Sequence, residues 1–306
     1  MILTHSRASA YQSCPRRHWW AYELGIRPER DGAALSIGTA YHAGLEALNN
    51  GGSIDDAMAA IEIDDPVNRV IAGGLVSGWA WRWSNYPINV IEAEQVFTFR
   101  PRYSRHVVSG KIDGIAELDD GRIAVVEYKT TSEAIDYKSD YWQRLMIDRQ
   151  ISTYILGARS LGYKPDFVIY DVARKPGIRP RTNRKTGEVE TIDAYAARLA
   201  DDIAARPDWY FARHEVDRIE TDLYETEAEL SDIAWSIARH RKVDLWPRNT
   251  DSCRRWGKCP YFTPCCNRHD PRTQGLPSGY VRVKDVHVEL TMKGERHGHD
   301  ANYVSL

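Results

Sequence analysis

The pattern of hydrophobic and polar residues divides the chain into a helical first part and a mixed second part. Apolar residues recur at helical spacing in 6–24, 36–49, 54–62 and 66–86. Alternating or continuous apolar runs then predict strands at 91–99, 106–118, 122–130 and 166–173. We therefore expect a helical N-terminal lobe over residues 1–90, followed by an α/β core.

Turn signals and connection lengths indicate how these strands are joined. Asp119-Asp120-Gly121 predicts a tight turn that makes 106–118 and 122–130 an antiparallel hairpin. A helix expected over 137–161 separates this hairpin from strand 166–173, as in a crossover unit. The remaining expected elements are a hairpin around 183–187, a helix at 193–206, a strand near 209–219, a helix at 222–241 and a strand within 280–290.

Composition and charge narrow the class of protein. The 306 residues are 42% hydrophobic and 27% charged, which is typical of a globular protein, and the formal net charge is −2. This nearly neutral net charge does not indicate a nucleic-acid-binding protein, but residues 172–185 carry six Lys or Arg and no acidic residue. That segment is either a phosphate-binding face or a solvated basic loop. No membrane-spanning run or secretory signal is visible, so we expect a cytoplasmic protein.

Candidate chemistry first appears in the stretch AVVEYKTT, residues 124–131. Alternation places Glu127 and Lys129 on one face of the strand, and Asp113 lies in the preceding strand of the hairpin. Paired carboxylates suit Mg²⁺ or Mn²⁺, and a neighbouring ammonium can hold a water and offset phosphate charge. Taken alone, the Glu-x-Lys pattern more often marks a solvated strand, so its neighbours decide the interpretation.

With its neighbours, the stretch resembles the PD-(D/E)XK nuclease superfamily. GTAYHAGLE (38–46), RQISTYILG (149–157) and CPYFTPC (259–265) are similar to motifs of its RecB-like branch and follow in the same order. The resemblance implies a restriction-endonuclease-like mixed sheet flanked by helices. It also implies a site whose metal ligands are His42, Asp113, Glu127 and the carbonyl of Tyr128. Lys129 would be its catalytic lysine, and Gln150 and Tyr154 would support the site.

Five cysteines lie at two places in the chain, Cys14 and a C-terminal group of four. An odd number in a reducing compartment argues against a disulfide framework. The resemblance implies a structural [4Fe–4S] cluster on Cys14, Cys253, Cys259 and Cys265, with Cys266 as the spare that could exchange with Cys265. The Cys253-x₅-Cys259 spacing departs from the family pattern, with Trp256 where a nearer cysteine would lie. A Cys₄ zinc site is the alternative, although paired C-x₂₋₄-C knuckles are missing.

The resemblance therefore predicts a metal-dependent DNA exonuclease that acts on single strands or free ends. An endonuclease and a non-cutting DNA-binding subunit are the alternatives. The family serves recombination, viral DNA processing and CRISPR adaptation, and unwinding would need a helicase or recombination partner because no G-x-x-x-x-G-K-[ST] motif is present.

Several further residues are secondary candidates. Glu94 is a carboxylate that could line the same cleft, although a solvated strand position is the better explanation of it. Trp19, Trp20 and Tyr22 could stack on bases or pack in a core. The candidates for DNA contacts are Arg16, Arg17, Arg174 and Lys175. We expect 91–245 to form the nuclease core, 246–270 the cysteine segment and 271–306 a tail, all within one compact domain.

Overall fold

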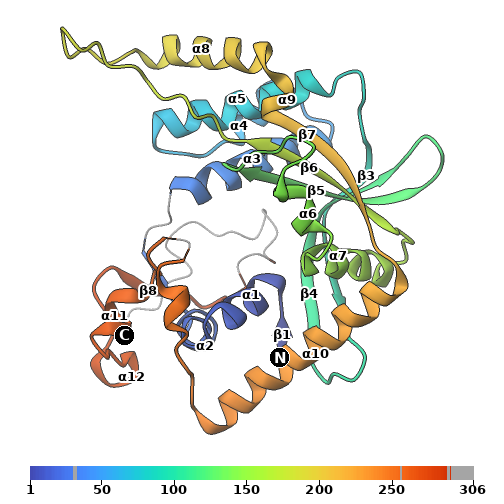
Figure 1. The fold of residues 1–306 in the computed structure, drawn as a ribbon, viewed down its shortest axis with the longest axis vertical. Coiled ribbons are helices and arrows are strands. Elements are labelled where there is room, and N and C mark those ends of the chain that lie inside the picture. Colours follow the sequence, from blue (N-terminus) through green and yellow to red (C-terminus); the bar gives the residue numbers. More distant parts are fainter. Residues whose placement is uncertain (30–32, 256, 288–289, 291–306) are drawn as a thin grey trace. The chain divides into compact units, whose positions relative to one another are not determined.

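A computed structural model describes residues 1–29, 33–255, 257–287 and 290 (Figure 1). Its contacts divide the chain into two compact units. Unit 1 comprises 1–31, 96–111 and 220–306, and unit 2 comprises 32–95 and 112–219. Of the strands β3 (Asn89–Phe99) and β4 (Val107–Glu117), residues 89–95 and 112–117 belong to unit 2, and the other residues of each strand belong to unit 1.

Unit 2 is built on a mixed sheet. The end of β4 pairs antiparallel with β5 (Ile123–Thr131), β5 pairs parallel with β6 (Phe167–Arg174), and β6 pairs antiparallel with β7 (Phe211–Asp217). The helices of this unit are α3 (Ala33–Asn49), α4 (Ile54–Ala59), α5 (Pro66–Arg82), α6 (Asp140–Leu145), α7 (Arg149–Ser160), α8 (Ile192–Ala205) and α9 (Pro207–Tyr210). Helices flank the sheet, which confirms the predicted mixed α/β architecture (Figure 1).

The predicted hairpin and crossover are both confirmed. Gly121 has a φ of 80°, a left-handed conformation that favours glycine, and its N–H donates to the carbonyl of Leu118 over 2.8 Å. The parallel pairing of β5 with β6 then requires a long connection, which α6 and α7 supply.

The single helix predicted over 137–161 is wrong, because α6 ends at Leu145 and α7 begins at Arg149. The Asp148 side chain accepts a hydrogen bond from the Gln150 N–H over 2.8 Å, so it caps the start of the second helix. Because of this break, α6 and α7 are two separate helices. A further difference is the short helix α9, which precedes β7 within the expected 209–219 strand.

The core of unit 2 lies where α3, α5 and α8 pack on one face of the sheet. Tyr41, Leu75, Tyr128 and Tyr195 are among its fully buried side chains. The same region buries a carboxylate, Asp171, which accepts hydrogen bonds from the indole N–H of Trp79 and from Arg213 Nε, both over 2.9 Å. A buried charge is tolerated only when it is paired in this way.

Unit 1 joins the first residues to the last part of the chain. Its elements are β1 (Ile2–Leu3), α1 (His5–Ser13), α2 (Pro15–His18), the π-helical turn η1 (Trp19–Glu23), β2 (Ile26–Pro28), α10 (Glu220–Val243), the 3₁₀ turn η2 (Thr250–Cys253), α11 (Phe262–Cys266), α12 (Pro271–Gln274) and β8 (Tyr280–Arg282). β1 pairs parallel with β4 at Val107 and Val108, and β2 pairs antiparallel with β8. β8 is shorter than the strand expected within 280–290, of which residues 288 and 289 lie outside the described residues.

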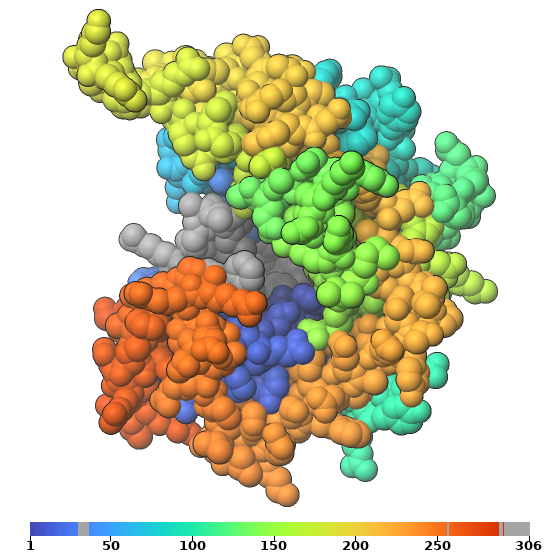
Figure 2. Space-filling view, in the orientation of Figure 1, coloured from blue at the N-terminus to red at the C-terminus, as the bar shows by residue number. Residues whose placement is uncertain are grey.

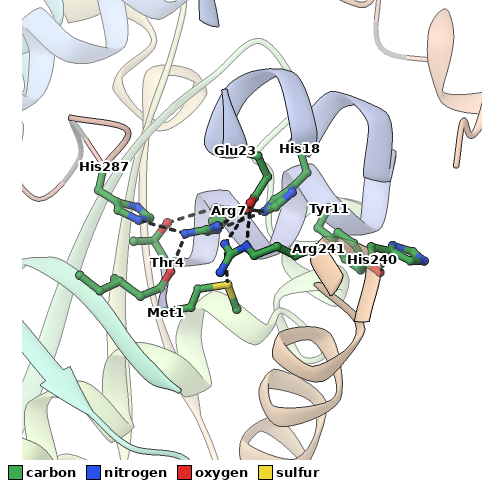
Figure 3. A network of polar contacts seen from close by, with 10 residues as sticks. Met1, Thr4, Arg7, Tyr11, His18, Glu23, His240, Arg241 and His287 are labelled. Carbon is green, nitrogen blue, oxygen red and sulfur yellow. Dashed lines mark hydrogen bonds and ion pairs between the residues drawn. The ribbon is translucent and has the colours of Figure 1, made fainter. Parts of the chain in front are cut away.

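A polar network ties α1, η1 and α10 together inside unit 1 (Figure 3). Arg7 donates to Glu23 Oε1 over 2.7 Å and to His18 Nε2 over 3.1 Å, while Arg241 donates to both oxygens of Glu23. Beside the network, the side chains of Trp19, Trp20 and Tyr22 are buried, so these aromatic residues pack in a core. None of the described helices is both long and apolar enough to span a membrane.

Candidate active site

The two predicted carboxylates meet at the point where β4 and β5 separate. The last paired residues of the hairpin are Gly114 and Val126, so Asp113 and Glu127 come directly after the pairing ends. Asp113 Oδ2 accepts a hydrogen bond from the main-chain N–H of Tyr128 over 2.9 Å. This bond replaces a ladder hydrogen bond and directs the Asp113 carboxylate toward β5.

His42 reaches this position from α3, which packs closely on β5. A Cβ atom at Gly38 would lie 3.3 Å from Thr130 Oγ1, so glycine allows the helix to approach the strand. One helical turn later, His42 Nδ1 lies 3.4 Å from Asp113 Oδ1. The Gly-Thr-x-x-His motif thus combines a close packing contact with a functional side chain on the same helix.

Lys129 lies against Glu127, as strand alternation predicts. Lys129 Nζ contacts Glu127 Oε1, while the second oxygen, Oε2, is buried and has no hydrogen-bond partner among the described residues. The Glu127 side chain is only 2% exposed, and burial raises its pKa to about 8 against the opposing effect of Lys129. Burial also disfavours the charged form of Lys129, but Glu127, Tyr154 and Asp113 together outweigh burial and raise the pKa of the ammonium.

The second pair, His42 and Asp113, is similarly coupled. Burial alone would lower the pKa of His42, but Asp113 outweighs it and raises the pKa. Burial would raise the pKa of Asp113, but His42, Lys129 and the Tyr128 N–H together outweigh burial and lower that pKa. The site therefore contains two carboxylates, each in contact with one nitrogen cation or potential cation.

Gln150 and Tyr154 lie together on α7, beside the same four residues. Gln150 Nε2 donates to the Tyr154 hydroxyl over 2.9 Å. Burial raises the pKa of Tyr154, and the next largest influence on this pKa is the charge of Glu127. Tyr154 therefore lies near Glu127, in agreement with the packing of α7 against β5.

Sequence reasoning missed two tyrosines on this face of the sheet. Tyr170 of β6 is the register partner of Glu127, and the charge of Glu127 is the largest influence after burial on its raised pKa. Tyr141 of α6 contacts Tyr170, with ring centroids 6.4 Å apart. The register itself was the available signal, because a parallel strand after the crossover must place one of its residues beside Glu127.

The secondary candidates lie at other places. Glu94 is in β3 with a φ of 53°, a conformation that is uncommon outside glycine. The guanidinium of Arg174 lies over the Trp209 ring at 4.1 Å, and the main-chain N–H of Lys175 donates to Thr131 over 2.7 Å. Lys175 thus lies beside Thr131, the last residue of β5.

The donor set suits a hard divalent cation, with two carboxylates, an imidazole and one carboxylate oxygen that lacks a partner. As the side chains stand, no three His, Cys, Asp or Glu residues come together as a metal-binding group in the described part of the chain. The contacts explain this arrangement, because Lys129 covers one oxygen of Glu127 and His42 covers one oxygen of Asp113. A cation would have to replace these nitrogen contacts.

The cysteines line a separate cavity of about 650 Å³ in unit 1. Its walls include all five cysteines together with five arginines, Arg16, Arg17, Arg248, Arg254 and Arg255. Arg248 Nε donates to Cys265 Sγ over 3.2 Å, and the Asn249 N–H donates to Cys14 Sγ over 3.3 Å. Burial raises the pKa of the Cys253 and Cys259 thiols. The cavity thus collects the residues predicted as cluster ligands, without forming a metal-binding group among the described residues.

A mixed sheet with Asp on one strand and Glu-x-Lys on the next is the defining arrangement of the PD-(D/E)XK class. The model of the PD-(D/E)XK nuclease superfamily matches residues 2–267, and the chain belongs to this superfamily.

Solved structures are similar in part. A candidate exonuclease from Eubacterium rectale is 12% identical, with 88% of each chain covered and a TM-score of 0.45. The protein SSO0001 is 13% identical over 78% of this chain and 86% of its own, with a TM-score of 0.32. With TM-scores this low, neither similarity bears on function. Curated protein sequences contain no match.

Proposed function

We propose that the protein is a metal-dependent DNA nuclease of the RecB-like branch that removes nucleotides from DNA ends, preferably from single strands. The observation that carries this proposal is the buried carboxylate of Glu127, whose Oε2 has no partner among the described residues. Its other oxygen contacts Lys129, and the charge of Asp113 is near enough to help raise the pKa of Glu127. Such a group is costly unless a ligand satisfies it, and a divalent cation is the ligand that two neighbouring carboxylates favour.

Each residue of the site then has a role. His42, Asp113, Glu127 and the Tyr128 carbonyl would hold one or two Mg²⁺ or Mn²⁺ ions. Such an ion supplies Lewis acidity and makes a bound water more acidic. Lys129 orients the attacking water and stabilises the negative charge that develops on the phosphate. The hydrogen bond from Tyr128 to Asp113 keeps the first carboxylate aimed at the reacting group.

Substrate contacts extend from this centre. Gln150 and Tyr154 support the site and contact the DNA strand from α7. Arg174, Lys175 and the basic segment after them would contact phosphates, which bind basic side chains without regard to sequence. In unit 1, Arg16 and Arg17 have the same chemistry, although Arg16 already donates to the carbonyl of Trp246.

The cysteine cavity would hold a structural [4Fe–4S] cluster on Cys14, Cys253, Cys259 and Cys265, with zinc as the competing metal. Thiolates are the usual ligands of such clusters. One cluster would link the end of α1 to the C-terminal segment of unit 1. Anaerobic purification followed by iron, sulfide and zinc analysis tests this assignment. Colourless protein with one zinc per chain would overturn the cluster, and protein without either metal would overturn both.

The test of the nuclease proposal uses purified full-length protein with Mn²⁺ and end-labelled linear or circular single-stranded DNA. Degradation of linear strands with sparing of circles is expected of an exonuclease. Cleavage of circles would indicate an endonuclease, and binding without cleavage would indicate a DNA-binding subunit. Any role in recombination, DNA processing or CRISPR adaptation would then depend on a partner that unwinds the duplex.

A further inference from the structure

A column of three aromatic rings stands on the same face of the sheet as Glu127. Tyr137 stacks on His214 with ring centroids 5.6 Å apart and an interplanar angle of 28°. His214 in turn lies on Trp142, with centroids 4.0 Å apart. Trp142 is 9% exposed and its indole N–H donates to the Ile135 carbonyl over 3.0 Å, which fixes the base of the column.

The register of the sheet gives the distance from this column to the candidate active site. Glu127 pairs with Tyr170, and Tyr170 pairs with His214. Paired residues on adjacent strands project to the same face, and strands are about 4.8 Å apart, so His214 lies about 10 Å from Glu127. The rings of Trp142, Tyr141 and Tyr170 are successive neighbours along this path.

The outer ring of the column is open to solvent. Tyr137 is 80% exposed, and the segment that carries it and α6 (green) lies at the surface of the face seen in Figure 2. An isolated exposed tyrosine needs no explanation. This one differs because one face of its ring is held on a fixed stack, while the ring as a whole stays exposed.

We infer that Tyr137 is a base-stacking residue, which holds a nucleobase of single-stranded DNA beside the active site. A flat ring that is already held in place offers a π-face to any base, at a low cost in conformational entropy. A base on Tyr137 lies beyond His214 by the 5.6 Å between the two rings and by one further stacking distance of about 3.4 Å, so it lies within about 19 Å of Glu127. Because stacked bases rise about 3.4 Å each, this distance corresponds to a base within about six nucleotides of the scissile phosphate.

The local charge favours a base over a phosphate as the occupant. Lys138 follows Tyr137, but Asp136 and Asp140 flank the two residues, so the loop is not a basic patch. Stacking depends little on salt, whereas phosphate contacts weaken steeply as salt rises. The contribution of Tyr137 to affinity should therefore be the same at low and high salt. This inference rests on the proposed nuclease function.

The test measures binding of a labelled single-stranded oligonucleotide to full-length protein with Mn²⁺ in a Lys129→Ala background, in which cleavage does not consume the probe. Tyr137→Ala should weaken binding by about 5- to 150-fold at every salt concentration, the range of one lost base stack. Tyr137→Phe should bind like the parent. Tyr86→Ala is the matched control, since Tyr86 is 69% exposed and lies elsewhere in unit 2.

A second arm locates the base. An abasic site at the contacted position, within about six nucleotides of the scissile phosphate, should weaken binding to the parent and remove the difference between the parent and Tyr137→Ala. Equal affinities of parent and Tyr137→Ala for intact DNA would overturn the stacking role, even if cleavage by wild-type protein is confirmed. A parent that binds no DNA would overturn the proposed function as well.

Discussion

The main-chain N–H of Tyr128 donates to Asp113 Oδ2 over 2.9 Å, although the two residues are on different strands. This bond connects the first carboxylate to the strand that carries Glu127 and Lys129. It forms where the ladder of β4 and β5 has ended, so the sheet itself opens the space in which the charged side chains gather. The fold thereby determines both the position and the orientation of the candidate active site.

Asp113→Asn removes the negative charge of the side chain but keeps an oxygen that can accept the hydrogen bond from Tyr128. The amide oxygen can still accept from Tyr128, so thermal stability should stay close to that of wild type, while cleavage with Mn²⁺ should fall by about 100-fold or more. Glu117→Gln is the matched control, because Glu117 is an exposed carboxylate at the end of the same strand. Wild-type cleavage by Asp113→Asn would contradict the assigned role.

Lys129→Ala should separate metal binding from catalysis. The Lys129 ammonium contacts Glu127 Oε1, so it competes with a cation for that oxygen. Removing it should leave Mn²⁺ affinity, measured by calorimetry, equal to or tighter than that of wild type. Cleavage should nevertheless fall by about 100-fold because the phosphate loses a preorganised positive charge. Weaker Mn²⁺ binding would show that Lys129 organises the ligands instead.

The hairpin, the crossover and the Glu-x-Lys face could be predicted from the sequence because local patterns determine them. Asp119-Asp120-Gly121 specifies the turn, and strand alternation places Glu127 beside Lys129. The break before Arg149 was missed because a side-chain cap, from Asp148, overrides a continuous helical pattern.

Contacts between segments that lie far apart in the chain could not be predicted from the sequence. The stack of Tyr137 on His214 joins residues 77 positions apart, and the pairing of Arg241 with Glu23 joins residues 218 positions apart. No periodicity encodes such pairs. Likewise, the burial of Trp19 and Trp20 depends on partners such as Tyr261, whose ring stacks on Trp20 at 5.7 Å.

Asp171→Ala should destabilise the protein by about 3–5 kcal/mol, because it leaves the Arg213 guanidinium, 13% exposed, without its buried partner. Asp208→Ala is the matched control. Asp208 also pairs with an arginine, Arg82, but its side chain is 85% exposed, so the loss should be at most about 1 kcal/mol. Urea unfolding of the two variants measures the difference. Equal losses would mean that burial does not govern the strength of these pairs.

Cys265→Ser and Cys266→Ser should differ in metal content. Cys265 is half-buried and accepts a hydrogen bond from Arg248, whereas Cys266 is exposed. If Cys265 is the fourth ligand, its serine variant should lose metal and visible absorbance after anaerobic purification, while Cys266→Ser should keep both. The reverse result would exchange the roles of the two cysteines. Retention by both single variants would mean that either cysteine can act as the fourth ligand, and retention by the double variant would exclude both.

His18 should make the stability of unit 1 fall in mild acid. Its ring is fully buried against Tyr22 and Trp246, and burial, with Arg7 as the next cause, lowers its pKa from 6.5 to about 2. Other basic groups facing it are Arg241, His240 and His287, while Glu23 Oε1 lies 3.9 Å from its Nε2.

Because the folded pKa is the lower one, the unfolded chain binds the extra proton as the pH falls below 6.5. The free energy of unfolding should therefore lose about 1.4 kcal/mol from this residue by pH 5.5. His18→Gln keeps an acceptor for Arg7 but cannot titrate, so its stability should decline less between pH 7 and pH 5.5. Urea unfolding across this range measures both proteins, and parallel declines would mean that His18 is protonated in the folded state.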